Sequence, residues 1–227
     1  MSVSRGRVIV LEGQESAGKS TQAPRLLRWL GDRGVDAILV REPGGTDAGE
    51  KIRELLLHVP YQLTAAAEAL LFMASRAELV DRVIKPALRE GRTVVLDRFF
   101  LSTYAYQVAG RGLDAGLVAN ANALATQGLV PDLTVLLTLA PSERRARLDR
   151  RGGHDKIERA GEHFHAQVDM AFESFLDPAW QAKHPESGPI VAVDGAGSED
   201  EVLSRITAAI AQAWPETFAA SSGFHQQ

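Results

Sequence analysis

The feature that most restricts the fold of this chain is a glycine-rich stretch at residues 8–21, VIVLEGQESAGKST. In it, Gly13 is followed by four residues and then by Gly18, Lys19 and Ser20, with an apolar run before them and a helical pattern after. This spacing between a strand and a helix forms a loop whose backbone amides surround phosphate oxygens, helped by the helix N-terminus. A glycine-rich turn can match the spacing by chance, but the flanking strand and helix weaken that alternative. The stretch therefore predicts a loop that binds a nucleoside triphosphate through Gly13, Gln14, Glu15, Ser16, Ala17, Gly18, Lys19, Ser20 and Thr21.

Short apolar runs rich in β-branched residues predict buried parallel strands. There are five of them: VIVLE (8–12), AILVR (37–41), TVVLD (93–97), LTVLLTL (133–139) and IVAV (190–193). Helical patterns separate the runs, the clearest at 64–90 and from Ser198 to about Ala213, where Ser-Glu-Asp-Glu is typical of a helix start. Alternating strands and helices predict the α/β P-loop NTPase fold, a five-stranded parallel sheet flanked by helices, with ligands at the carboxyl ends of the strands.

Length and composition are those of a single globular domain, which we place at residues 1–214 of the 227, followed by a small, polar tail at 215–227 that is expected to fray. A net charge of −4 argues against a nucleic-acid partner, and no apolar stretch approaches the ~20 residues of a membrane span. The absence of cysteine excludes disulfides, thiol catalysis and Cys-bound zinc, and is consistent with a cytoplasmic location.

A phosphate-binding loop does not by itself distinguish an enzyme from a nucleotide switch. The chain has no Asn-Lys-x-Asp stretch of the kind that reads guanine, so a GTPase is excluded, while an ATP-driven switch stays possible. Arg41 ends the second predicted strand, Arg76 lies in the long helix and Arg98 follows the third strand. Each of these can be an ordinary solvated arginine, but Arg98 stands at the edge of the sheet where ligands bind. Arg98 there predicts a second pocket, for a dianionic phosphate.

Several stretches together resemble thymidylate kinases in their order and spacing, over about residues 7–200. They are GQESAGKST, REPGGTDAGEKIR, LLFMASRAELV, DRFFLSTYAYQVAGRGLD and RRGGHDKIER, of which REPGGT and the DR-x3-S-x2-AYQ pattern are the most specific. The resemblance implies a nucleoside monophosphate kinase that uses ATP and Mg²⁺ to phosphorylate dTMP, and that forms a homodimer. A deoxynucleoside kinase is the alternative; it would need a base at the 5′-hydroxyl and would not need three arginines for a neutral acceptor.

The resemblance also implies roles for single residues in the acceptor pocket. For the phosphate, it implies that Arg98 binds the acceptor phosphate and that Arg41 contributes to the same pocket. For the base, it implies that Phe72 stacks on thymine, that Arg76 donates to a thymine carbonyl, and that the remaining polar edge is read by Thr103 and Gln107. For the sugar, it implies that the Tyr106 ring lies under it and excludes a 2′-hydroxyl, and that Glu15 holds the 3′-hydroxyl. For Phe72 the sequence alone favours a core position, because LLFMA is an apolar helix face.

The predicted reaction is a direct, in-line phosphoryl transfer. The acceptor phosphate has a second pKa near ~6 and is already a dianion, so no general base is required. Catalysis then depends on positioning and on neutralisation by Lys19, Arg98 and Mg²⁺, the metal being bound by Ser20 and, through a water, by Asp97. For Asp97, a purely structural pairing with Arg98 is an equal alternative.

Ser16 leaves the loop without the arginine that some thymidylate kinases carry there, so another arginine must neutralise the transferring group. We expect it from a helical lid at about 142–160, with Arg151 as first choice and Arg147 and Arg150 as alternatives, although at least one of the three can be simply solvated. The adenine is expected between the lid and the VDGAGS loop at 193–198, bound largely by backbone.

Overall fold

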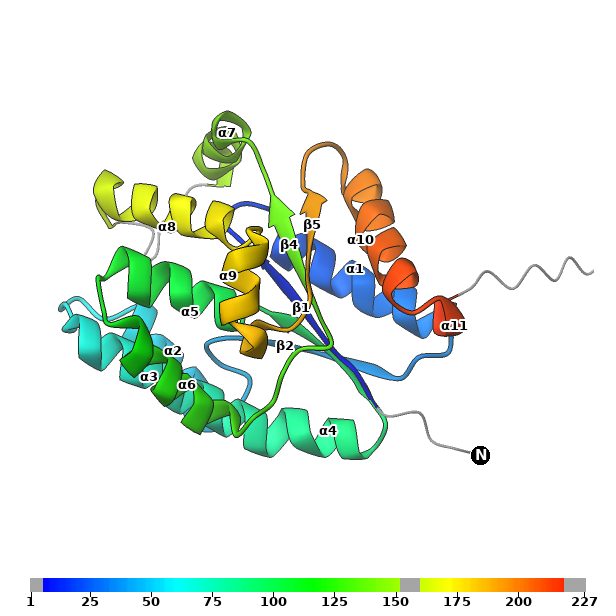
Figure 1. The fold of residues 1–227 in the computed structure, drawn as a ribbon, viewed down its shortest axis with the longest axis horizontal. Coiled ribbons are helices and arrows are strands. Elements are labelled where there is room, and N and C mark those ends of the chain that lie inside the picture. Colours follow the sequence, from blue (N-terminus) through cyan, green and yellow to red (C-terminus); the bar gives the residue numbers. More distant parts are fainter. Residues whose placement is uncertain (1–5, 152–159, 219–227) are drawn as a thin grey trace, which may run out of the picture.

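The structure, a computed structural model, describes residues 6–151 and 160–218 (Figure 1). Within these ranges the chain forms one parallel sheet, with the strand order β2-β3-β1-β4-β5. The strands are β1 (Val8–Gly13), β2 (Ala37–Arg41), β3 (Thr93–Asp97), β4 (Leu133–Thr138) and β5 (Ile190–Asp194). All five predicted strands and the predicted fold class are therefore confirmed.

The strands read as continuous apolar runs because both faces of the sheet are buried. Along β1, Ile9 and Leu11 join a cluster that α1 and α10 cover, whereas Val8 and Val10 join a second cluster under α3 and α4. Successive side chains of a strand point to opposite faces, so two apolar layers need apolar residues at every position. The arrangement leaves the carboxyl edge of the sheet, where β1, β2 and β3 end, as the polar edge.

The helices lie on both faces of the sheet (Figure 1). They are α1 (Lys19–Gly31), α2 (Asp47–Leu57), α3 (Ala65–Leu79), α4 (Lys85–Arg89), α5 (Phe100–Thr103), α6 (Ala115–Thr126), α7 (Pro141–Arg151), α8 (Glu162–Ser174), α9 (Pro178–Lys183), α10 (Glu199–Ala213) and α11 (Pro215–Phe218), with π-helical turns η1 (Val80–Ile84) and η2 (Tyr104–Gly110) and a 3₁₀ turn η3 (Pro185–Ser187). None of the helices in the described part of the chain is both long and apolar enough to cross a membrane.

Two predicted helices have the expected starts. The pattern at 64–90 is the run α3–η1–α4, which begins where the Thr64 hydroxyl accepts a hydrogen bond from the amide of Ala67. At α10, Ser198 and Glu201 form a reciprocal capping box, the Ser198 side chain accepting from the Glu201 amide and the Glu201 carboxylate accepting from the Ser198 amide.

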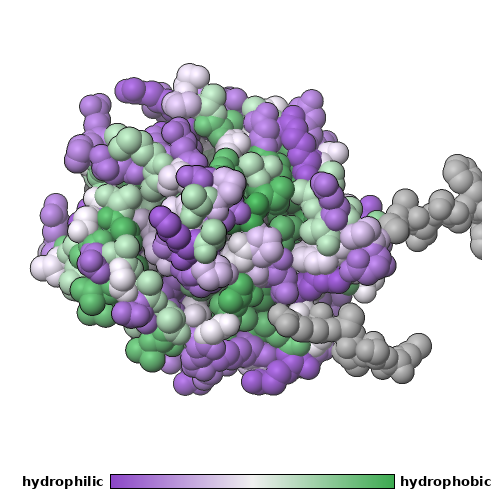
Figure 2. Space-filling view, viewed as in Figure 1, coloured by the Kyte–Doolittle hydropathy of each residue, from purple (hydrophilic) through white to green (hydrophobic). Residues whose placement is uncertain are grey.

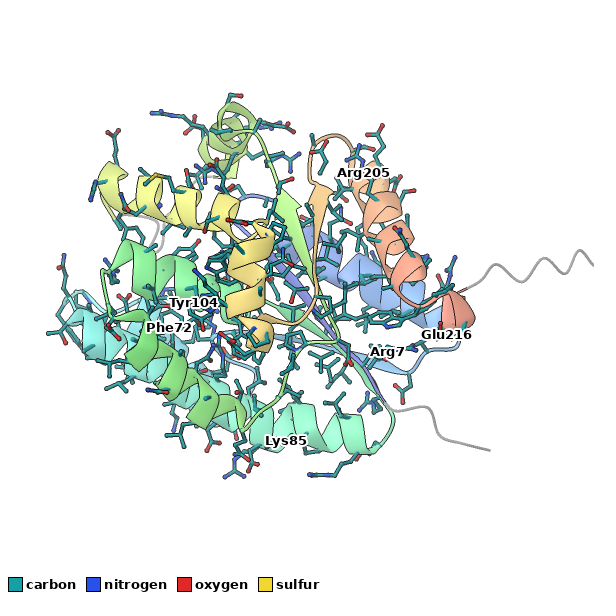
Figure 3. The ribbon with its side chains drawn as sticks, in the orientation of Figure 1. Arg7, Phe72, Lys85, Tyr104, Arg205 and Glu216 are labelled. Atoms are coloured by element: carbon teal, nitrogen blue, oxygen red, sulfur yellow. The ribbon has the colours of Figure 1, made fainter. Side chains whose placement is uncertain are left out.

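The expectation that the chain frays from Pro215 is wrong for residues 215–218. These residues form α11, whose Phe218 ring lies 5.0 Å from the ring of Trp29. Arg7, just before β1, pairs with Glu216 at 3.2 Å, and Figure 3 shows the two side chains close to each other. The helix is retained because Phe218 covers an aromatic surface of α1 and because Arg7 ties it to the start of the sheet. Residues 219–227 lie outside the described part of the chain.

Candidate active site

The glycine-rich stretch forms the turn between β1 and α1 that its spacing predicts. Gly13 and Gly18 have φ angles of +141° and +103°, and a Cβ on Gly13 would lie 2.5 Å from the carbonyl oxygen of Leu137. Only glycine fits such positions without strain. Ser16 also has a positive φ, +58°, and its buried hydroxyl has no hydrogen-bond partner within the described residues.

Lys19 is buried inside this loop, with 5% of its surface exposed. Its ammonium donates to the carbonyl oxygens of Gly13 and Gln14, both at 2.7 Å. Burial and, secondarily, the charge of Arg98 lower the pKa of Lys19 to about 7. A buried cation that donates to neutral carbonyls can exchange them for the oxygens of a polyphosphate, which would hold its proton much more strongly.

The two residues predicted to hold a metal ion lie next to each other. The Ser20 hydroxyl donates to Oδ2 of Asp97 at 3.0 Å, which joins the start of α1 to the end of β3. A hydroxyl and a carboxylate are hard oxygen ligands that suit Mg²⁺, which normally takes few protein ligands and keeps several waters. Within the described ranges there is no group of three or more His, Cys, Asp and Glu that could hold a metal by itself.

A cavity of about 350 Å³ lies at the carboxyl edge of the sheet and is lined by most of the predicted site residues. It is lined by Glu15, Ser16, Gly18, Lys19, Ser20, Thr21, Arg41, Glu42, Pro43, Arg53, Leu57, Phe72, Arg76, Asp97, Arg98, Ser102, Thr103, Tyr106 and Gln107. All the residues predicted for the acceptor are in this set. The cavity therefore brings residues of the phosphate loop and residues of the second predicted pocket to one place.

Arg98 projects into the cavity from a turn directly after β3. Its φ is +74°, in the left-handed region that residues other than glycine rarely adopt. Its Nη1 donates to the Ser102 hydroxyl at 3.0 Å, and its guanidinium carbon lies 5.3 Å from the centre of the Tyr106 ring. Burial lowers the pKa of Arg98, but the nearby Tyr106, Asp97 and Glu12 more than offset this and raise it, so the side chain stays charged.

Arg76 is almost completely buried and already has a partner for each of its five N–H groups. Nε and Nη2 donate to the carboxylate of Glu42, Nη2 also donates to the carbonyl oxygen of Phe99, and Nη1 donates to the Thr103 hydroxyl at 2.9 Å and to Asn122 at 2.6 Å. Arg76 lines the cavity, but donation to a further acceptor would require one of these hydrogen bonds to be exchanged.

The other residues predicted for the base and the sugar have suitable surroundings. Phe72 is half-buried on the cavity wall rather than enclosed in the core, and Figure 3 shows its side chain toward the inside of the molecule from α3. The side-chain amide nitrogen of Gln107 is buried and has no hydrogen-bond partner within the described residues. The Tyr106 hydroxyl donates to the Glu15 carboxylate at 3.3 Å, and burial raises the pKa of Tyr106, so the hydroxyl keeps its proton.

The lid arginines differ in their positions. Arg147, on α7, donates to the carbonyl oxygen of Gly195 at 2.9 Å, and its Nη1 would lie 3.8 Å from a Cβ on Gly18. Arg150 is exposed and donates only to the carbonyl oxygen of Ala146 among the described residues. Arg151 ends α7, but its side chain and the rest of the expected lid, 152–159, lie outside the described part of the chain.

The loop expected near adenine passes over the phosphate loop. A Cβ on Gly195 would lie 3.0 Å from the carbonyl oxygen of Ala17, so this glycine permits a close approach of the two loops. Arg205, labelled at α10 in Figure 3, donates to the carbonyl oxygens of Asp194 and Ala196 and so holds the loop from behind.

Several residues around the cavity were not predicted. Arg53 lines it and donates to the carbonyl oxygen of Pro43 at 2.9 Å; it stands in the stretch REPGGTDAGEKIR, but one arginine in a helix pattern carries no specific signal. Ser102 contacts Arg98, and beside a neighbouring cavity Arg144 of α7 pairs with Asp169 of α8. Nothing in the sequence indicates the last pair, because two distant helices bring it together.

A phosphate-binding loop that shares one cavity with buried arginines and an aromatic wall, at the carboxyl edge of a parallel sheet, defines a P-loop kinase of the nucleoside monophosphate class. The chain belongs to the thymidylate kinase family, whose model matches residues 11–184. It is 42% identical over 210 residues to a thymidylate kinase of Deinococcus radiodurans, covering 92% of this chain and 98% of that protein.

Two further comparisons agree. The chain is 46% identical over 168 residues to a thymidylate kinase of Carboxydothermus hydrogenoformans, covering 74% of this chain and 83% of the relative. The crystal structure of a thymidylate kinase from Ehrlichia chaffeensis superposes with a TM-score of 0.72 at 27% identity, covering 91% of this chain and 99% of that one.

Proposed function

We propose that this chain transfers the γ-phosphoryl group of ATP to the phosphate of dTMP, which gives dTDP and ADP. The observation that carries this proposal is the shared cavity, in which Lys19 of the phosphate loop and Arg98 of the acceptor pocket are close enough for their charges to interact. Two anionic substrates must meet in line, and cations on both sides of the transferred group reduce their repulsion. The acceptor phosphate is already ionised at neutral pH, so no residue is assigned as a base.

The acceptor phosphate would be bound by Arg98, with Arg41 and Arg53 at the outer wall of the cavity. Glu15 would accept a hydrogen bond from the 3′-hydroxyl, and its present bond from Tyr106 fixes its orientation. The Tyr106 ring, held from the other side by the Arg98 guanidinium, would lie under the sugar and leave no room for a 2′-hydroxyl. These roles make the pocket specific for a deoxyribonucleoside monophosphate.

Thymine would stack on Phe72, with its polar edge toward Thr103 and Gln107. The unpartnered amide nitrogen of Gln107 is suited to donate to a base carbonyl, since a buried donor without an acceptor is costly. Arg76 can donate to the base only if a bond is exchanged, and the bond to the Thr103 hydroxyl is one whose loss leaves no carboxylate unpaired. Arg76 would then both read the base and keep its ion pair with Glu42.

Mg²⁺ would be held by the Ser20 hydroxyl and, through water, by Asp97, where it would neutralise charge on the ATP phosphates. Among the lid arginines whose side chains the structure describes, Arg147 has the better position to contact the transferring phosphoryl group, since it lies close to Gly18 of the phosphate loop. Arg151 stays a second proposal. The adenine would lie between α7 and the loop at 193–198.

We also propose that the protein acts as a homodimer through α3 and α6, which pack against each other. Leu70, Leu117 and Leu124 on these helices are 62%, 71% and 81% exposed, and Figure 2 shows apolar surface over this part of the molecule. Several large exposed side chains of this kind on neighbouring helices are typical of an interaction surface.

The proposed function is tested by incubating the protein with ATP, Mg²⁺ and each member of a panel of nucleoside monophosphates. Phosphoryl transfer is measured by the amount of ADP formed. We expect dTMP to be the best acceptor and thymidine to be inactive, because Arg98 needs an anionic phosphate. Turnover of thymidine in preference to dTMP, or of no acceptor at all, would contradict the proposal.

A further inference from the structure

Glu12, near the end of β1, is a completely buried carboxylate that does not line the nucleotide cavity. A buried charge of this kind is expensive unless it is well hydrogen-bonded. Its Oε1 accepts from the amides of Phe99 at 2.7 Å and Ser102 at 3.0 Å, and its Oε2 accepts from the Ser102 hydroxyl at 2.8 Å. Each of these donors belongs to the segment that directly follows Arg98.

Through these bonds Glu12 holds the start of α5. Phe99, the residue at the N-cap position, has no side-chain oxygen to cap the helix. In a capping box, one side chain binds the amide three residues into the helix and another binds the N-cap amide. Glu12 binds both amides by itself, from a strand 87 residues earlier in the sequence.

The turn that Glu12 stabilises contains the strained residue Arg98. Its φ of +74° turns the chain sharply at the end of β3, so that the guanidinium lies in the cavity instead of continuing along the sheet. A residue other than glycine keeps such a conformation only when neighbouring contacts fix it. The two amide bonds from Phe99 and Ser102 to Glu12 fix the chain immediately after this turn.

The Ser102 hydroxyl continues the connection to the Arg98 side chain. A hydroxyl has one proton, and here it is donated to Oε2 of Glu12 at 2.8 Å. The lone pairs of the same oxygen are therefore available to accept a hydrogen bond, and Nη1 of Arg98 donates to this oxygen at 3.0 Å. A neutral group in place of Glu12 would compete less well for that proton.

We propose that Glu12 is a positioning residue for phosphoryl transfer, which aims the Arg98 guanidinium at the acceptor phosphate through Ser102 and the turn at 98–99. The inference rests on the proposed role of Arg98 in acceptor binding. Glu12 does not line the cavity, so its effect on the acceptor is expected to pass through Arg98. Its charge also raises the pKa of Lys19, and the Ser102 variants, which keep that charge, separate the two effects.

The test compares kinetics and melting temperatures of Glu12→Gln, Ser102→Ala and Ser102→Thr, each alone and combined with Arg98→Ala. Ser102→Ala keeps both backbone bonds to Glu12 and should raise KM for dTMP about 5–10-fold, with KM for ATP within about twofold. Ser102→Thr, which keeps the hydroxyl, should restore KM for dTMP to within about twofold of wild type. Glu12→Gln should raise it at least about tenfold.

The combination with Arg98→Ala separates positioning from simple stabilisation. Once Arg98 is absent, Glu12→Gln and Ser102→Ala should change KM for dTMP by less than about twofold more. The proposal is overturned if either variant keeps its full effect without Arg98, if KM for ATP rises equally, or if Ser102→Ala has no effect. If Glu12→Gln does not melt cooperatively, its kinetics are not interpreted, and the proposal is tested with the Ser102 variants by the same changes in KM.

Failure of the proposed function gives a different result. The wild-type panel shows first which monophosphate is phosphorylated; if it is not dTMP, the proposed function fails while the variants are compared on the monophosphate that is accepted. Because Glu12 is inferred to act on the phosphate and not on the base, the same pattern of KM changes is expected there.

Discussion

Lys19 and Arg98 are the two cations on which the proposed chemistry depends, and the charge of each is maintained in a different way. The charged form of Lys19 is stabilised only partly, because burial lowers its pKa more than Asp97, Glu12 and Glu15 raise it, which leaves the pKa at about 7. Arg98 keeps its charge because the neighbouring acidic groups and Tyr106 outweigh its burial. In the proposed site, the free protein therefore has one permanently charged cation, Arg98, for the acceptor, and one, Lys19, that would become fully charged when the donor binds.

The state of Lys19 leads to a prediction about proton uptake. Above about pH 7 the free Lys19 loses its proton, and the phosphates of ATP raise its pKa again, so ATP binding should take up close to one proton at about pH 8. Titration calorimetry in buffers of different ionisation enthalpy measures this number, and Lys19→Met should abolish it. An uptake that is equal in wild type and Lys19→Met would assign the proton to another group.

The same shift has a consequence for stability. Because the pKa of Lys19 falls from 10.5 to about 7 on folding, the unfolded chain binds more protons between these values. Lys19 therefore destabilises the free protein most below about pH 7, and this contribution is lost as the pH rises toward about 10.

Arg98 allows a second prediction at this scale, with Arg41 as the matched control. Arg98→Ala should raise KM for dTMP at least about tenfold and leave ATP affinity within about threefold, because it removes a buried charged donor from the acceptor side only. Arg41 is proposed as a weaker contact at the outer wall of the same cavity, where its side chain is 56% exposed and paired with Glu50, so Arg41→Ala should change KM for dTMP less than about threefold. Equal losses of ATP and dTMP affinity in Arg98→Ala would place Arg98 on the donor side.

At the scale of elements, α7 is the helix whose side chains contact both the loop after β5 and helix α8. Arg147 reaches from it to Gly195, and Arg144 forms an ion pair with Asp169 of α8. Asp169 also accepts from the side-chain amide of Gln14 at 3.1 Å. One carboxylate on α8 thus holds both the lid helix and the phosphate loop, beside a second cavity of about 700 Å³.

This connection predicts an energetic coupling between α7 and α8. The side chains of Arg144 and Asp169 are 19% and 26% exposed, so their pair is less screened than a surface ion pair. A double-mutant cycle with Arg144→Ala and Asp169→Ala, read by urea unfolding, should give a coupling of about 1 kcal/mol. Strictly additive effects would show that the two helices are held together by other contacts.

The lid arginines give the second prediction at this scale. Arg147→Ala should lower kcat about 100-fold or more, because a charge that meets the transferring phosphoryl group acts mainly in the transition state. Affinity for dTMP, measured without ATP, should be unchanged. Arg150→Ala is the matched control and should keep kcat within about threefold, since Arg150 is exposed. If Arg147→Ala also stays within threefold, Arg151 becomes the better assignment.

For the molecule as a whole, the two faces of the sheet are buried for stability, whereas its carboxyl edge holds the cavity. α1 and α10 close one apolar layer, α3 and α4 close the other, and the cavity opens at the edge between them. α3 contributes to several of these features, since it supplies Phe72 and Arg76 to the cavity and Leu70 to the outer surface. A partner bound at α3 would therefore also support the wall of the acceptor pocket.

The proposed dimer is tested on this outer surface. Leu124→Asp, at a side chain that is 81% exposed, should convert the dimer to a monomer in sedimentation experiments, because a charge would have to be buried in the interface. Met170→Asp on α8, where the side chain is 53% exposed, is the matched control and should leave the dimer intact. A wild-type protein that sediments as a monomer at micromolar concentration would contradict the proposal.

The sequence by itself was sufficient for the strands, the phosphate loop and the start of α10. These depend on local patterns: β-branched runs buried on both faces, glycines at positions with positive φ, and a capping box four residues long. The family resemblance added the acceptor residues, and all of them line one cavity. Phe72 shows the limit of local pattern, because an apolar helix face does not distinguish a core residue from a cavity wall.

Only the tertiary structure decided which partners the polar residues have. Arg76 was expected to donate to a thymine carbonyl, and in the structure its five N–H groups donate to Glu42, Thr103, Asn122 and Phe99. The tail at 215–218 was expected to fray, yet it forms α11 because Trp29 is there to be covered. Glu12 had no assigned role until its contacts with the turn after Arg98 were known. Hydrogen bonds between residues 30 to 90 positions apart leave no periodic signal in a sequence, since only folding brings their atoms within 3 Å.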